Sequence, residues 1–119
     1  MNSLLKSVVI CLLLVSSKLI ASPSDNEICR FAVASLVSAQ PQQVRDYRQG
    51  VDGVELRWSN GASTELFICT IDGDSILWRR AQDSQWQQSP SLGYSEQGAE
   101  LIIEHRLGSA VLRQDRYRR

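Results

Sequence analysis

The chain has 119 residues and carries 13 basic and 13 acidic residues, so its formal net charge is zero. A chain of this length is sufficient for one domain. Without an excess of positive charge, it has no electrostatic reason to favour nucleic acid. Because it contains a single histidine, a zinc site built from several histidines is excluded.

The first 21 residues have the pattern of a secretory signal peptide. Lys6 supplies the positive start, residues 7–17 are mostly apolar, and Ala21 is a small residue at a plausible cleavage position. The apolar segment is shorter than the roughly 20 residues that a membrane span needs. We therefore expect cleavage after Ala21, with Ser17 as the alternative. Residues 22–119 then form a single periplasmic or secreted domain without a transmembrane segment.

Cleavage would also change the charge of the protein. Both lysines, Lys6 and Lys18, lie in the predicted signal peptide, so residues 22–119 hold 11 basic residues, all arginine, beside all 13 acidic residues. The expected net charge of this part is therefore −2. Since it contains no lysine, a Schiff-base or lysine-base mechanism is excluded.

The first element predicted after the signal peptide is a helix over residues 23–40. Ser24 and Glu27 have the spacing of a capping box, in which the serine hydroxyl accepts from the backbone amide of Glu27 and the glutamate side chain returns to Ser24. Apolar residues then follow at helical spacing, and Cys29 lies on the same face. Pro41 ends the helix, because the residue before a proline avoids the helical conformation.

After Pro41 the apolar residues alternate with a period of two, which predicts β strands. The predicted strands cover residues 44–49, 54–59, 65–71, 75–80, 99–105 and 110–114. Short glycine-containing turns separate them, and Asp72-Gly73 is a strong hairpin signal. Strands joined by such turns form an antiparallel meander.

The segment from residue 81 to residue 98 has a different composition. It is rich in glutamine and serine, and Trp86 and Tyr94 are its only large side chains. We expect a long loop, with at most a short irregular strand near Trp86, and loops of this length are often functional. The arginine-rich end at residues 116–119 is expected to fray.

Two cysteines, Cys29 and Cys69, remain after the predicted cleavage, and an even pair in an exported domain predicts a disulfide. Two free buried thiols are the alternative. A disulfide requires Cα atoms within about 7 Å, so the helix would lie across the Cys69 face of the sheet. The predicted fold is α+β, with one N-terminal helix packed on a curled antiparallel sheet of five or six strands, in two layers stapled by one disulfide.

The cysteine in an N-terminal helix and a later hairpin motif together resemble a group of small, uncharacterised, exported bacterial proteins. The hairpin motif reads Phe67-x-Cys69-x-Ile71-Asp72-Gly73-x-x-Ile76-x-Trp78-Arg79. The resemblance covers about residues 29–80. It implies a periplasmic setting and a disulfide between helix and sheet, and it implies no particular activity.

Exposed aromatic and arginine side chains are the candidates for contact with a partner. Trp86 and Tyr94 lie in the predicted loop, and tryptophan is frequent at the centres of interfaces. Arg79, Arg80 and Arg106 could bind phosphates or carboxylates with two parallel hydrogen bonds. Alternatively, Trp86 plugs the open end of the sheet and the arginines form a solvated edge.

These features predict a non-enzymatic binding or interaction module, such as an inhibitor or immunity-type protein. The expected partner is an envelope protein or an anionic envelope ligand, and no cofactor is expected. One alternative is an accessory subunit of an envelope complex. The other is a small envelope enzyme that uses His105.

His105 is the candidate for catalysis because histidine titrates near neutral pH, and Glu104 and Ser109 are close in sequence. Neighbouring residues on a strand point to opposite faces, however, so Glu104 should not contact it. Asp72-Gly73-Asp74 could begin a calcium loop, but the later oxygen ligands are missing. We therefore expect neither a catalytic residue nor a metal ligand.

Overall fold

The structure is a computed structural model that describes residues 21–119. The predicted signal peptide therefore lies, except for Ala21, outside the described residues. Within residues 21–119, no helix is long and apolar enough to cross a membrane. The elements are helix α2 (Asp25–Val37), the 3-10 helix η1 (Pro41–Gln43), and strands β1 (Val44–Gln49), β2 (Val54–Ser59), β3 (Thr64–Asp72), β4 (Ser75–Arg80), β5 (Ser91–Gln97), β6 (Glu100–Leu107) and β7 (Ala110–Arg118).

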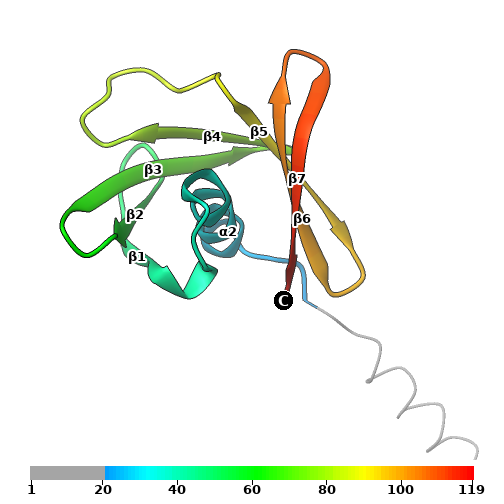
Figure 1. The fold of residues 1–119 in the computed structure, drawn as a ribbon, viewed down its shortest axis with the longest axis horizontal. Coiled ribbons are helices and arrows are strands. Elements are labelled where there is room, and N and C mark those ends of the chain that lie inside the picture. The colour runs from blue at the N-terminus through cyan, green and yellow to red at the C-terminus, as the bar shows by residue number, and fades with distance from the viewer. Residues whose placement is uncertain (1–20) are drawn as a thin grey trace, which may run out of the picture.

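The strands form one open antiparallel sheet in the order β1 to β7, and α2 lies in its hollow (Figure 1). The predicted α+β meander is therefore confirmed, but the sheet has seven strands rather than five or six. The additional strand is β5, which occupies the second half of the predicted loop. Its only large apolar side chains are Leu92 and Tyr94, so its alternation is too short to stand out, and pairing with β6 along its whole length holds it in the sheet.

The sheet curls where β4 meets β5. These strands share only two residue pairs, Ser75 with Gly93 and Ile76 with Leu92. Figure 1 shows β6 and β7 crossing the direction of β3 and β4 beyond this point. As a result α2 contacts β1, β2 and β3 on one side and β6 on the other.

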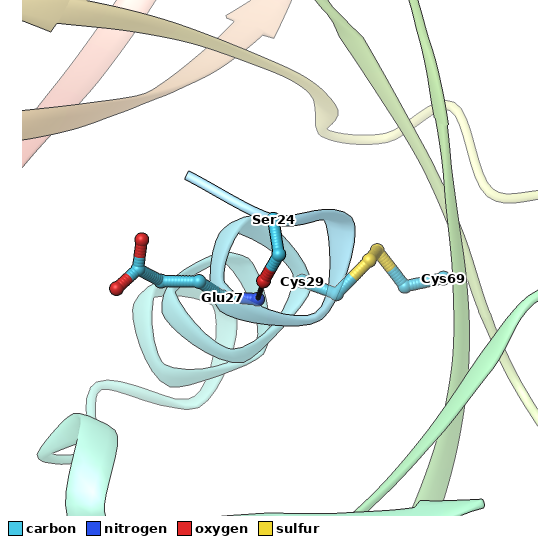
Figure 2. Close-up of a disulfide and its surroundings, with 4 residues drawn as sticks. All are labelled: Ser24, Glu27, Cys29 and Cys69. Carbon is cyan, nitrogen blue, oxygen red and sulfur yellow. Dashed lines mark hydrogen bonds between the residues drawn. A yellow bond between two sulfur atoms is a disulfide. The ribbon is translucent and has the colours of Figure 1, made fainter. Parts of the chain in front are cut away.

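The helix is shorter than the predicted range of 23–40. Ser24 Oγ accepts a hydrogen bond from the Glu27 backbone amide at 3.2 Å, as predicted (Figure 2). The Glu27 carboxylate does not return to Ser24, because it accepts from Arg119 Nε at 2.9 Å. The helix ends before Ser38, which adopts a left-handed conformation with φ of 56°.

A disulfide joins Cys29 of α2 to Cys69 of β3, and the Cα atoms are 5.8 Å apart. Figure 2 shows the Cys29 side chain leaving the helix toward the strand. Both cysteines are fully buried, and they lie in a core formed by the helix and the inner face of the sheet. The predicted disulfide and the helix placement that follows from it are confirmed.

The C-terminal residues do not fray, so this expectation is wrong. Arg118 pairs with Glu100 in the sheet, and the Arg119 backbone amide donates to Ala99 O at 2.9 Å. The ion pair between Arg119 and Glu27 also ties the end of the chain to α2. A strand was not expected here because the residues are mostly charged. In the structure, arginines of this segment contact acidic residues of neighbouring elements.

Both edges of the sheet contain a bulge. The pairing of β1 with β2 skips Tyr47, and the pairing of β7 with β6 skips Leu112. Both side chains are exposed. Bulges and charged side chains at an edge hinder the addition of further strands, so these edges are protected against aggregation.

The disulfide should supply a large part of the stability. It closes a loop of 40 residues, and removing such a crosslink lowers the free energy of unfolding by about 4 kcal/mol in the chain-entropy model. We expect this loss in the double variant Cys29→Ala/Cys69→Ala, measured by urea denaturation. Equal midpoints for the double variant and the oxidised protein would contradict the expectation.

Candidate functional site

The structure brings together two of the predicted partner-binding residues, Arg79 and Trp86. The Arg79 guanidinium lies 5.3 Å from the centre of the Trp86 ring. It also donates to Asp52 Oδ2 at 3.0 Å and to the Asp83 carbonyl oxygen at 2.5 Å. Trp86 is partly buried. These contacts tie Arg79 to the first half of the predicted loop and pair its charge with Asp52.

The other predicted partner-binding residues lie apart from this pair. Arg80 points to the α2 side of the sheet, where its guanidinium lies 5.6 Å from the Phe67 ring. Tyr94 packs against the core. Arg106 forms an ion pair with Glu104. The structure therefore offers no single surface that contains all five residues, and their role in binding stays a prediction.

His105 belongs to a polar cluster that the sequence analysis did not find. Ser35 Oγ of α2 lies 2.6 Å from His105 Nε2 and donates to Asp115 Oδ2 at 2.5 Å. Arg113 Nη2 donates to the Ser35 carbonyl oxygen and to Asp115 Oδ2, at 2.5 and 2.9 Å. The expected neighbour Glu104 instead pairs with Arg106. The cluster thus links α2 to β6 and β7.

Burial lowers the pKa of His105 below its ordinary value of 6.5, and the positive charge of Arg113 lowers it further. The Asp115 carboxylate acts in the opposite direction and does not compensate. Burial also raises the pKa of Tyr117, whose ring stacks on Phe31 with 5.1 Å between ring centres. The cluster is therefore built around a neutral histidine.

The hydrogen bonds of this cluster differ from those of a nucleophilic triad. In a triad the histidine accepts from the serine and donates to the carboxylate. Here the serine donates to Asp115, so its one hydroxyl proton is not available to His105 Nε2, which also lies 3.3 Å from Arg113 Nη2. Ser35 is also only 1% exposed.

His105 and Arg113 border a surface hollow of about 330 Å³, but Ser35 is not among the residues that line it. A molecule in this hollow would contact the histidine without reaching the hydroxyl group. The arrangement therefore favours a structural role for Ser35, Asp115 and His105. Ser35 was detectable in the sequence as a polar residue on an apolar helix face.

A second hollow lies on the sheet face opposite α2, and we call it the β1–β3 hollow. It has a volume of about 350 Å³ and is lined by Gln43, Arg45, Arg57, Ser59 and Thr64. Arg45 and Arg57 are direct partners across the β1–β2 pairing. The Ser59 and Thr64 hydroxyl oxygens lie 3.0 Å apart. All five side chains can donate hydrogen bonds, which suits an anion.

A third depression, the α2–β7 groove, runs between the helix, η1 and the C-terminal strand. Its volume is about 450 Å³, and its lining includes Arg30, Arg116, Arg118 and Arg119 beside a single acidic residue, Glu27. Three of these arginines are in ion pairs, with Asp46, Glu100 and Glu27. Within residues 21–119, no three His, Cys, Asp or Glu side chains lie close enough to hold a metal ion.

No protein-family model, curated protein or solved structure matches the chain. The resemblance to small exported bacterial proteins therefore stays a prediction.

His105 should make the protein less stable in mild acid. Its folded-state pKa lies below 6.5, so as the pH falls below about 6.5 the unfolded chain binds a proton that the folded chain does not. The free energy of unfolding should fall between this pH and the folded-state pKa. His105→Gln should flatten this part of a pH series of denaturation midpoints.

Because His105 is the only histidine in the chain, its ring protons can be followed without ambiguity by NMR. Titration of the folded protein at or above the ordinary pKa would contradict the expectation. Ser35→Ala provides a control, because it removes the hydroxyl while the burial and Arg113 remain.

Proposed function

We propose that this protein is an exported, non-enzymatic binding module that recognises an anionic group in the β1–β3 hollow. The observation that carries the proposal is the direct pairing of Arg45 with Arg57 on neighbouring strands. Like charges in this position destabilise a sheet. An anion bound between the two side chains would remove that repulsion, so binding and folding would support each other.

The other arginines show that this pair is unusual. Of the 11 arginines in the described part of the chain, eight form ion pairs with acidic side chains. Arg45 and Arg57 are not among these eight. Their charge is therefore available to a ligand, whereas Arg79, the predicted contact, is already paired with Asp52.

The hollow also supplies the geometry for an oxyanion. Each guanidinium offers a planar fork of donors that matches two oxygens of a phosphate or carboxylate. Ser59, Thr64 and Gln43 add hydroxyl and amide donors around the forks. Arg57 additionally lies 5.6 Å from the Tyr47 ring, which restricts where its guanidinium can go.

Export is supported by two independent features. The N-terminal pattern is that of a secretory signal peptide, and a buried disulfide is typical of proteins in oxidising compartments. An anionic group on an envelope protein or an envelope polymer fits this setting. An inhibitor or immunity-type protein is the narrower form of the proposal.

Inorganic phosphate is the simplest probe of the hollow. We expect the Nε–H NMR signals of Arg45 and Arg57 to shift with saturation when phosphate is added to the purified protein. Arg57→Gln should weaken binding about tenfold, because it removes one charge-assisted pair. Acetate in a parallel titration compares a carboxylate with a phosphate.

Arg48→Gln is the matched control. Arg48 lies on the same strand as Arg45, is exposed, pairs with Glu55 and does not line the hollow. This variant changes the net charge as much as Arg57→Gln does and should bind phosphate normally. Shifts that grow linearly with phosphate, or that are as large at Arg48 as at Arg57, would refute the proposed site.

A further inference from the structure

The β1–β3 hollow and the α2–β7 groove are both lined by residues of η1. Gln42 lines the groove, and its chain neighbour Gln43 lines the hollow. The two depressions therefore adjoin along the chain, although one faces the helix and the other faces the outer side of the sheet. A ligand longer than a single small anion can contact both by crossing η1.

The groove contains positive charge that forms no ion pair within residues 21–119. Arg118 is absent from the ion pairs of residues 21–119 and is exposed. Arg30 reaches Asp46 through Nη2 at 3.4 Å, but its Nε is buried without a hydrogen-bond partner in the described structure.

We infer that the ligand is a linear chain of phosphate groups that crosses η1 and contacts Arg45 and Arg57 at one end and Arg118 at the other. This inference rests on the proposed function and specifies its ligand class. We call this path the arginine track. It joins the three arginines of residues 21–119 that form no ion pair with an acidic side chain, although Glu100 is the cross-strand neighbour of Arg118.

Two features favour phosphate over carboxylate and a chain over a single ion. Two arginines at directly paired strand positions line the hollow, and one carboxylate has oxygens for only one guanidinium fork, whereas a phosphate can accept from both. A single phosphate in the hollow would not contact Arg118, which lines the groove. Linked phosphates contact successive positions with an advantage in effective concentration.

A comparison of inorganic phosphate with a short linear polyphosphate tests the arginine track. We expect polyphosphate to bind the purified protein more than about tenfold tighter than phosphate in isothermal titration calorimetry. Arg118→Gln should remove most of this gain while phosphate binding in the hollow is unchanged. Arg57→Gln should weaken the binding of both probes.

The Arg48→Gln variant is again the control for the loss of one positive charge. If Arg48→Gln and Arg118→Gln weaken polyphosphate binding equally, the effect is general electrostatics and the track is refuted. If Arg118→Gln binds polyphosphate as tightly as the unaltered protein, the track is also refuted, and the phosphate site in the hollow survives. If neither probe binds, the proposed function fails as well.

A glutamate oligomer of the same charge separates phosphate from carboxylate recognition. Weak binding of this peptide beside tight binding of polyphosphate would support the assignment. Equal binding of the two polymers would overturn it in favour of an acidic peptide. All the substituted side chains are exposed, so circular dichroism and thermal midpoints should match those of the unaltered protein.

Discussion

The contact between α2 and the concave face of the sheet is the interaction on which the rest of this structure depends. In the described part of the chain, one helix of 13 residues covers an open sheet of seven strands, so the sheet curls around the position of this helix. Two anchors hold it. The disulfide fixes Cys29 to β3, and the Ser35 hydroxyl binds His105 of β6 and Asp115 of β7. The disulfide therefore attaches the helix to the half of the curled sheet that contains β3, and the Ser35 hydroxyl attaches it to the half that contains β6 and β7.

The elements with strong local signals were predictable from the sequence. The helix follows from its serine cap and apolar face, and the β3–β4 hairpin follows from Asp72-Gly73 between alternating apolar residues. Strand β5 was not predictable, because its place in the sheet depends on pairing with β6 more than on its own composition. The same holds for the last residues of β7, whose arginines bind acidic side chains distant in sequence.

The candidate site was less predictable than the fold, because it depends on strand register. Next to the turn, β1 pairs Gln49 with Val54, and continuing this register would place Arg45 opposite Trp58. The bulge at Tyr47 shifts the pairing by one residue and places Arg45 opposite Arg57 instead. Neither the composition nor the periodicity of the sequence predicts this shift in strand register. The bulge therefore both protects the edge strand and creates the arginine pair.

A net charge near zero argues against binding to a polyanion only when the charges are evenly distributed. In the described part of this chain the acidic side chains are not evenly distributed relative to the arginines, because eight arginines form ion pairs and the remaining three line two depressions. Since charges separated by more than about 10 Å are largely screened at moderate salt, a ligand responds to the local excess rather than to the total. The way the fold pairs its charges, rather than the net charge, therefore determines where on the surface an anion would be favoured.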